Sequence, residues 1–253
     1  MKRQQQYTIE DCLNDQKKRK LTVAEPIKSF SSKSVTTKDK PNETYLINDK
    51  ENGAKVTFIA NFLTKKESKA LMKTILDTCE WSRDEFTIFG KTIPSPRRIS
   101  AFGERNYKAL YDNSKSYTNH HRRPPHDWIP EMQELKERVE KYTGETFTIA
   151  IINRYDGGQE SIGWHSDKEK DLVAGSSIVS ITLGAERDFQ FKKITKEDEG
   201  KPKIITKELT DGSMVVMNSD TQDHYQHCVP KRKNVKGTRI NITFRNVNRD
   251  LGK

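Results

Sequence analysis

The segment that most restricts the fold is Thr238–Arg245, whose side chains alternate between apolar and polar along its length. In an extended strand, alternate residues point to opposite sides, so one face would carry Ile240, Ile242 and Phe244. The opposite face would carry Arg239, Asn241, Thr243 and Arg245. Two guanidinium groups on one strand face are hard to place in a β-barrel unless that face lines a cavity holding an acid. The sequence therefore predicts a β-rich fold with an internal anion site.

A second segment, Asn153–Asp167, offers ligands for a metal ion. His165 and Asp167 are two residues apart, so in extended structure both side chains reach the same side. His227, far along the chain, is available as a third ligand. Two histidines and one carboxylate on one side of an ion, with the other positions open, suit non-haem Fe(II) oxygenases. With the two arginines, this triad predicts Fe(II) beside the dicarboxylate 2-oxoglutarate.

Two residues near His227 are expected to have no part in metal binding. His224 precedes it by three residues, and in a strand positions i and i+3 face opposite sides. Cys228 is expected to be a small buried side chain rather than a nucleophile. His227 is therefore the expected ligand from this segment.

These motifs resemble those of the AlkB family of Fe(II)/2-oxoglutarate-dependent dioxygenases over most of residues 55–247. The resemblance implies Fe(II) on His165, Asp167 and His227, with Arg245 completing the catalytic set. It implies that the carboxylates and neighbouring oxygens of 2-oxoglutarate are held by Asn153, Tyr155, Arg239, Thr243 and Arg245. The implied reaction uses O2, removes methyl groups from bases such as 1-methyladenine and 3-methylcytosine, and releases formaldehyde, succinate and CO2.

The segment Phe86–Ile93 is expected to form a hairpin with Phe89 and Gly90 at its tip. An aromatic side chain at a turn would leave apolar area exposed unless it enters another structure. Packing of Phe89 back into the core is the alternative. With Lys91 and the following Pro-Arg-Arg, the hairpin resembles the finger of AlkB members that act on duplex DNA. That resemblance implies that Phe89 enters the base stack and fills the gap left by an everted base.

The resemblance also implies other substrate contacts. Tyr117 is the favoured aromatic of the base pocket, and a basic loop on the opposite DNA strand would comprise Lys231, Arg232 and Lys233. Lys168 and Glu169 follow the metal motif; Glu169 would contact the base or remain a solvated loop carboxylate. Lys168 departs from the acid found there in duplex-acting members, so the base contacts can differ. The finger and basic loop together favour duplex DNA, although such a loop alone can simply be solvated.

The charge of the chain fits a polyanionic partner. Its formal net charge is +10, and residues 91–123 contain eight Lys or Arg against two acidic residues. Tyrosines and histidines lie among these cations, a combination suited to phosphate contact and base stacking. The charge thus favours a nucleic acid as partner, and the AlkB resemblance implies that this partner is double-stranded DNA with alkylated bases. The protein is expected to be a monomer.

The first fifty residues have few large apolar side chains and are expected to form a disordered basic tail. Lys17–Lys20 is typical of a nuclear-import signal, or else is a solvated charge run. The segment Gln6–Leu13 begins like a sliding-clamp motif but has Cys12 and Leu13 where paired aromatics are required. Nuclear localisation and clamp binding are expectations from these two segments.

The remaining chain, residues 51–250, is expected to form one dioxygenase domain. A capping box at Thr64 and Pro130 each predict the start of a helix, and short strands follow as far as Val247. This order predicts an α+β fold: a double-stranded β-helix (jelly-roll) core, supporting N-terminal helices and a nucleotide-recognition hairpin region. Three scattered cysteines favour a reducing compartment, and neither a secretory signal nor a membrane-spanning run is present.

Three functions remain compatible with the sequence. Oxidative demethylation of duplex DNA is favoured by the hairpin and the basic loop. An AlkB-type dioxygenase acting on RNA or single-stranded DNA is the first alternative. A catalytically inert nucleic-acid-binding jelly roll is disfavoured because all three metal ligands and both arginines are present.

Overall fold

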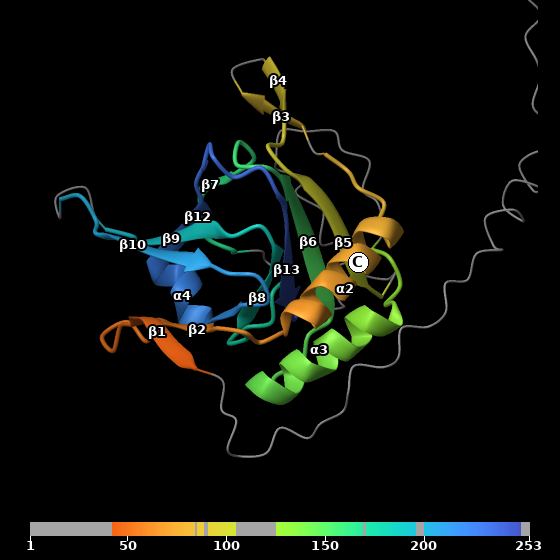
Figure 1. Cartoon of the computed structure of the whole chain (residues 1–253). Helices are drawn as coiled ribbons and strands as arrows, with labels where there is room; N and C mark the ends of the chain where they lie inside the picture. Colours follow the sequence, from red (N-terminus) through yellow and green to blue (C-terminus); the bar gives the residue numbers. More distant parts are fainter. Residues whose placement is uncertain are drawn as a thin grey trace, which may run out of the picture. The chain divides into compact units, whose positions relative to one another are not determined.

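The computed structural model describes residues 42–83, 85–88, 91–104, 125–168, 171–195 and 200–248. These residues form a seven-stranded sheet, a four-stranded sheet and a two-stranded hairpin (Figure 1). All the strand pairs within these three sheets are antiparallel.

The larger sheet supplies most of the framework. Its strands, in spatial order, are β1 (Glu43–Asn48), β2 (Lys55–Ile59), β11 (Met214–Met217), β8 (Ile178–Gly184), β13 (Thr238–Arg245), β6 (Ile149–Asp156) and β5 (Arg98–Gly103). Strand β1 lies inside the segment expected to be a disordered tail, and its pairing with β2 shows that structure begins before residue 50. Of its side chains only Ile47 is buried, so the sequence signal for this edge strand is weak. The rest of the expected tail, residues 1–41, lies outside the described residues.

The smaller sheet packs against one face of the larger one. Its spatial order is β10 (Ile204–Leu209), β9 (Arg187–Lys193), β12 (Tyr225–Val229) and β7 (Ile162–His165). Phe189 and Phe191 from β9 join Val56 and Phe58 from β2 in one buried apolar cluster. Two antiparallel sheets closed over a shared core form the jelly roll expected from the sequence.

Two helices cover the other face of the larger sheet. Helix α2 (Lys65–Thr78) begins at the expected capping box, in which the Thr64 and Glu67 side chains each accept the other residue's backbone N–H. Helix α3 (Pro130–Thr143) starts at a proline and ends at Gly144, whose φ of 75° is a left-handed conformation suited to glycine. None of the helices in the described part of the chain combines the length and apolar character needed to cross a bilayer.

A short helix, α4 (Ser219–His224), was not expected from the sequence. The residues that form it were assigned in part to a strand, and His224 is instead the last residue of the helix. The strand β12 begins at Tyr225. Helix α4 brings Gln222 close to the metal motif, with consequences for the site.

Strand β13 has the two faces that its alternation predicts. Ile240, Ile242 and Phe244 belong to the core cluster beneath the helices. Every residue from Arg239 to Arg245 is buried, so the polar face also points into the protein. Because β13 pairs with β8 on one side and β6 on the other, its position is fixed from both edges.

The hairpin expected from the sequence is present as β3 (Glu85–Ile88) and β4 (Lys91–Pro94). It lies apart from both sheets, at the top of Figure 1. All four residues of β4 are exposed. Phe89 and Gly90 lie outside the described residues.

We expect Thr64→Ala to lower the free energy of unfolding by about 1 kcal/mol, because the first turn of α2 loses an acceptor for the Glu67 backbone N–H. Urea denaturation followed by circular dichroism measures the change. Lys66→Ala, an exposed position in the same turn, is the control. Equal destabilisation by both substitutions would contradict the capping role.

Candidate active site

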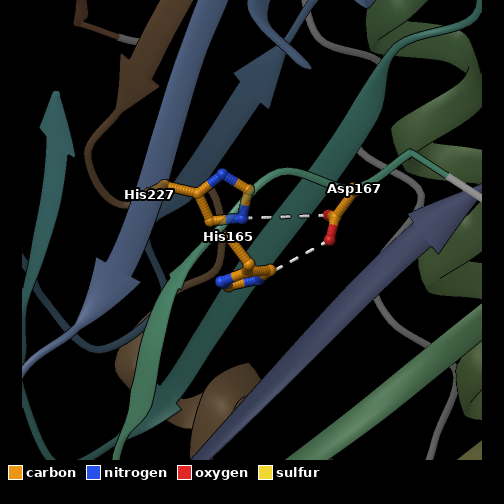
Figure 2. A group of neighbouring side chains, drawn as sticks. All are labelled: His165, Asp167 and His227. Atoms are coloured by element: carbon orange, nitrogen blue, oxygen red, sulfur yellow. Dashed lines mark ion pairs between the residues drawn. The ribbon is translucent and has the colours of Figure 1, made fainter. Parts of the chain in front are cut away.

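His165, Asp167 and His227 meet between β7 and β12. His165 is the last residue of β7 and is directly opposite His227 in the β12–β7 pairing. One potential ligand atom from each residue lies within 4.8 Å of the other two. His165 Nε2 is 3.6 Å from Asp167 Oδ1, and His227 Nε2 is 3.9 Å from Asp167 Oδ2 (Figure 2). The sequence-predicted triad is therefore assembled from two neighbouring strands and the residue just beyond one of them.

These distances suit a shared ion better than direct hydrogen bonds. Hydrogen bonds between nitrogen and oxygen are about 2.7–3.2 Å long. Two ligands that each lie about 2.1 Å from one ion can be up to about 4.2 Å apart. Both His–Asp separations, 3.6 and 3.9 Å, fall between those limits. The donor set and its spacing thus fit a divalent metal ion.

The two imidazoles are arranged to offer a ring nitrogen to a metal ion. His165 Nδ1 lies 2.8 Å from the backbone carbonyl of Gly163, an arrangement that leaves Nε2 for a metal. Burial lowers the pKa of His227 to about 4, against the opposing effect of Asp167. His227 is consequently uncharged at neutral pH, and its ring is 5.3 Å from that of Phe189.

Asp167 is held by contacts with both its side chain and its backbone. Arg245 Nη2 lies 3.0 Å from Asp167 Oδ2, and the Asp167 N–H donates to Gln222 Oε1 over 3.0 Å. Burial alone would raise the pKa of Asp167, but Arg245 and then the two histidines outweigh it and lower the pKa. Asp167 is therefore an ionised carboxylate in a fixed orientation.

The residues expected to hold a dicarboxylate lie on β13 and β6, beside the triad. The pairing of these strands places Arg239 opposite Tyr155, and Asn241 opposite Asn153. Arg239 and Tyr155 are each 1% exposed, and the guanidinium carbon is 5.3 Å from the centre of the tyrosine ring. Three of the expected residues, Arg239, Tyr155 and Asn153, are thus brought to one patch of the barrel interior.

The hydrogen bonds and charge of Arg239 show whether an anion fits the patch formed by β13 and β6. Its Nη2 donates to Thr182 Oγ1 over 3.0 Å. Its buried Nε and Nη1 have no hydrogen-bond partner among the described residues. Burial lowers its pKa to about 10, so the group is still a cation at neutral pH. A buried cation with donors to spare is suited to a carboxylate, as 2-oxoglutarate would supply.

The other polar residues of this patch are engaged with their neighbours. Asn241 Nδ2 donates to Ser180 Oγ over 2.6 Å, and Thr243 Oγ1 donates to Asn241 Oδ1 over 3.2 Å. Asn153 Oδ1 accepts a hydrogen bond of 2.7 Å from Arg97 Nε, a contact that links β6 to the segment after the hairpin. These bonds hold the polar face of β13 and β6 in shape.

The predicted substrate residues have different surroundings. Lys91, Lys231 and Lys233 are exposed. Arg232 instead forms ion pairs with Glu208 and, at 3.7 Å, with Asp188. Lys168 Nζ lies 3.1 Å from Asp223 Oδ1, at the end of α4. Phe89, Gly90, Tyr117 and Glu169 lie outside the described residues.

Sequence reasoning missed several residues that shape this region. Gln222 contacts Asp167 of the triad, and Arg97 contacts Asn153 of the expected co-substrate site. The fully buried Arg187 contacts the turn before β7 through Glu160 O. A signal for Arg187 was present, because Phe189 and Phe191 alternate with it and point inward. Arg97 belongs to the Pro-Arg-Arg already linked with the hairpin, but no local pattern indicated its contact with Asn153 or the contact of Gln222 with Asp167, since these partners lie far away in the sequence.

Comparison with known proteins assigns this chain to a family. Residues 55–245 match the model of the 2OG-Fe(II) oxygenase superfamily. The chain belongs to this superfamily. The predicted requirement for Fe(II), 2-oxoglutarate and O2 is that of the superfamily, and His165, Asp167 and His227 form a metal-binding triad in the structure.

Curated relatives confirm the AlkB resemblance. DNA oxidative demethylase ALKBH2 of Bos taurus is 37% identical over 165 residues, which cover 63% of this chain and 56% of that protein. The Homo sapiens protein of the same name is 36% identical, with coverage of 63% and 60%. Alpha-ketoglutarate-dependent dioxygenase alkB homolog 3 of Rattus norvegicus is 30% identical, with coverage of 77% and 64%. The chain therefore spans about three fifths of the length of these relatives.

A solved structure supports the fold. The structure titled "The structure of OsALKBH1" aligns with a TM-score of 0.53 at 17% identity, covering 76% of this chain and 96% of that one. At this identity the likeness concerns the fold alone.

We expect Asp167→Ala to weaken metal binding by more than about 100-fold, because it removes a ligand and leaves two neutral imidazoles. Co(II), which absorbs visible light when bound by such ligands, serves as the probe in a titration of the metal-free protein. Asp223→Ala removes a carboxylate that is 69% exposed and should leave Co(II) binding unchanged. Equal affinity in the Asp167 variant would reject the assignment.

Proposed function

We propose that this protein is an oxidative demethylase that repairs N-alkylated bases, such as 1-methyladenine and 3-methylcytosine, in double-stranded DNA. The reaction would use Fe(II), 2-oxoglutarate and O2, and would release formaldehyde, succinate and CO2. The observation that carries the proposal is that β13 supplies both Arg245, which contacts Asp167 of the metal-binding triad, and the buried Arg239 guanidinium, whose Nε and Nη1 have no partner among the described residues. An inert jelly roll would have no reason to keep such a cation on a strand that also contacts a metal ligand.

Each residue of the site has a role in this reaction. Fe(II), 2-oxoglutarate and O2, when bound, supply the oxidant that hydroxylates the methyl carbon on a base nitrogen, after which formaldehyde leaves. His165, Asp167 and His227 would hold the ion, and Arg245 would keep Asp167 ionised and oriented. Arg239 would bind one carboxylate of the co-substrate. Asn153, Tyr155 and Thr243 would contact its carboxylates or neighbouring oxygens. Phe189, packed against His227, would exclude water from one side of the site.

Duplex DNA as the substrate is supported by the relatives and by charge. The relatives named DNA oxidative demethylase ALKBH2 match this chain at 36% and 37% identity. Exposed Lys91 on the hairpin and Lys231 and Lys233 on the loop after β12 would meet phosphates. Arg232, paired with two carboxylates, would instead hold that loop in place. An everted base with a blocked pairing edge is the least costly to remove from the stack, which favours alkylated bases.

The N-terminal tail expected from the sequence would determine where in the cell this activity takes place and which protein it accompanies. We propose a nuclear protein, with Lys17–Lys20 as the import signal and Gln6–Leu13 as a clamp-binding segment. The domain within residues 51–250, extended by strand β1, would act as a monomer. A fluorescent tail peptide titrated with the sliding clamp tests the second assignment directly.

We expect Arg239→Ala to raise the KM for 2-oxoglutarate by about 10- to 100-fold, since a charge-assisted, two-pronged contact with a carboxylate is lost. Succinate formation at varied co-substrate concentration measures the change. Arg239→Lys keeps the charge without the fork and should give an intermediate KM. An unchanged KM in both variants would remove Arg239 from the co-substrate site.

The deciding experiment compares matched duplex and single-stranded oligonucleotides that carry 1-methyladenine, with formaldehyde release as the readout. We expect turnover on the duplex, and Phe89→Ala should reduce it more on duplex than on single strands. Equal turnover on duplex, single-stranded DNA and RNA would support the first alternative and argue against a finger. Absence of both formaldehyde and succinate would favour an inert nucleic-acid-binding protein.

A further inference from the structure

Strand β4 contributes no buried side chain that could hold the β3–β4 hairpin in place. All four side chains of β4 are exposed, and an isolated two-stranded hairpin is only marginally stable in water. Its direction must therefore be set by contacts at its base. One such contact is a backbone bridge between Ser82 and Ile99, which joins the segment before β3 to β5. This bridge consists of two reciprocal backbone hydrogen bonds of 3.0 and 2.8 Å and fixes the chain at one point before the hairpin.

Arg83 supplies a second contact at the base. It lies just before β3, and its Nη1 donates a 3.0 Å hydrogen bond to the backbone carbonyl of Ser95, just after β4. One guanidinium group therefore joins the two ends of the hairpin. Its Nη2 donates to Glu160 Oε1, in a different part of the chain, and the two side chains are 32% and 14% exposed.

Glu160 belongs to the turn Gly157–Ser161, which leads directly into β7 and its terminal residue His165. The second oxygen of Glu160, Oε2, accepts a 2.7 Å hydrogen bond from the Asp156 N–H. Its position within the turn is thus fixed. The adjacent Ser161 N–H donates to the carbonyl of Pro96 over 3.3 Å, which adds a backbone contact to the same junction. The hairpin base and the turn that leads into the metal-binding strand are consequently joined by the Glu160 carboxylate and by one backbone hydrogen bond.

The same turn is anchored firmly on its other side. Arg187, 1% exposed, donates hydrogen bonds to the carbonyls of Gly157, Glu160 and Pro230 at 3.2, 2.9 and 2.6 Å. The Gly158 N–H donates to Val235 O over 2.6 Å, so the loop that contains Lys231–Lys233 is tied to this turn as well. A Cβ at Gly158 would lie 1.6 Å from Arg232 O, which shows how closely the two backbones approach. Glu160 is therefore held in place on this side, and its contact with Arg83 can set the orientation of the hairpin.

We propose that Arg83 and Glu160 are positioning residues that hold the β3–β4 hairpin (Figure 1) at a set angle to the metal site. We propose further that this angle determines the preference for duplex over single-stranded DNA. The proposal rests on the proposed function, in which the hairpin meets a base stack. Single-stranded DNA has no duplex base stack for the hairpin to enter. A change in the hairpin's orientation should therefore reduce turnover of single-stranded DNA less than turnover of duplex DNA. Neither residue need touch DNA or the co-substrate.

The first test measures the hairpin without any reaction. In the metal-free protein, hydrogen exchange of the amides in Glu85–Ile88 and Lys91–Thr92 should be at least about threefold faster in Arg83→Gln than in the unaltered protein. Arg138→Gln is the matched control, because Arg138 likewise joins a carboxylate, Glu67, to a backbone carbonyl, Phe62 O. The control should leave hairpin exchange unchanged. Unchanged exchange in Arg83→Gln would overturn the proposal.

The second test measures substrate preference. The ratio of kcat/KM on duplex to kcat/KM on single-stranded 1-methyladenine substrates should fall about tenfold in Arg83→Gln and in Glu160→Gln. The double variant should lose less than the sum of the two single losses, because both substitutions break the Arg83–Glu160 contact and only Arg83→Gln also removes the hydrogen bond to Ser95 O. Arg83→Lys should recover part of the ratio, and Arg138→Gln should retain all of it.

The outcomes separate this proposal from the function on which it rests. Failure of the unaltered protein to act on duplex DNA would overturn the proposed function. Hydrogen exchange would still show whether the Arg83–Glu160 contact holds the hairpin in place. Duplex activity in the unaltered protein with an unchanged ratio in both single variants would overturn the positioning role alone. Additive losses in the double variant would also overturn it, because the two residues would then act separately. Urea denaturation of each variant shows whether the domain remains folded.

Discussion

The buried polar face of β13 is the constraint on which the rest of this structure depends. One strand has to supply Ile240, Ile242 and Phe244 to the helix-covered core while presenting Arg239 and Arg245 to the barrel interior. A shift of one residue in its pairing would exchange those faces and bury the cations among apolar side chains. Pairing with β6 and β8 on both edges prevents such a shift. The same register that builds the core therefore places the arginines beside the metal ligands.

The interior electrostatics follow from this arrangement. Tyr155 lies between two buried guanidinium groups, with its ring centre 5.3 Å from Arg239 and 5.8 Å from Arg187. Burial lowers the pKa of both arginines, which indicates that the surroundings do not fully compensate their charge. Both terminal nitrogens of Arg187 donate to backbone carbonyls, and of its donors Nε alone has no partner among the described residues. Arg239 lacks a partner at both Nε and Nη1, so it is the better arranged of the two to receive an anion.

Much of the candidate site was predictable because its residues follow strand periodicity. Alternation placed Arg239 and Arg245 on one face, and the two-residue spacing of His165 and Asp167 placed them together. The jelly roll followed from the order of helices and short strands. The partnership of His227 with His165 could only be supplied by resemblance, since nothing local to either residue encodes the pairing of β12 with β7.

What escaped prediction depends on contacts between distant segments. Strand β1 buries one side chain, too little for a clear pattern, and α4 is too short to show helical periodicity. Gln222 supports Asp167 from that helix, and Arg83 reaches Glu160 across many intervening residues. Such contacts depend on how loops direct each element, which residue spacing alone does not specify.

The incompletely paired guanidinium of Arg239 has a consequence for the lifetime of the protein. Without a bound anion, the folded protein bears the cost of the desolvated Arg239 charge, whereas the unfolded chain exposes the same group to water. Any diacid that fills the site removes part of that cost, and so favours the native state by mass action. The abundance of a small metabolite would then set how long a molecule survives proteolysis, as well as how fast it works.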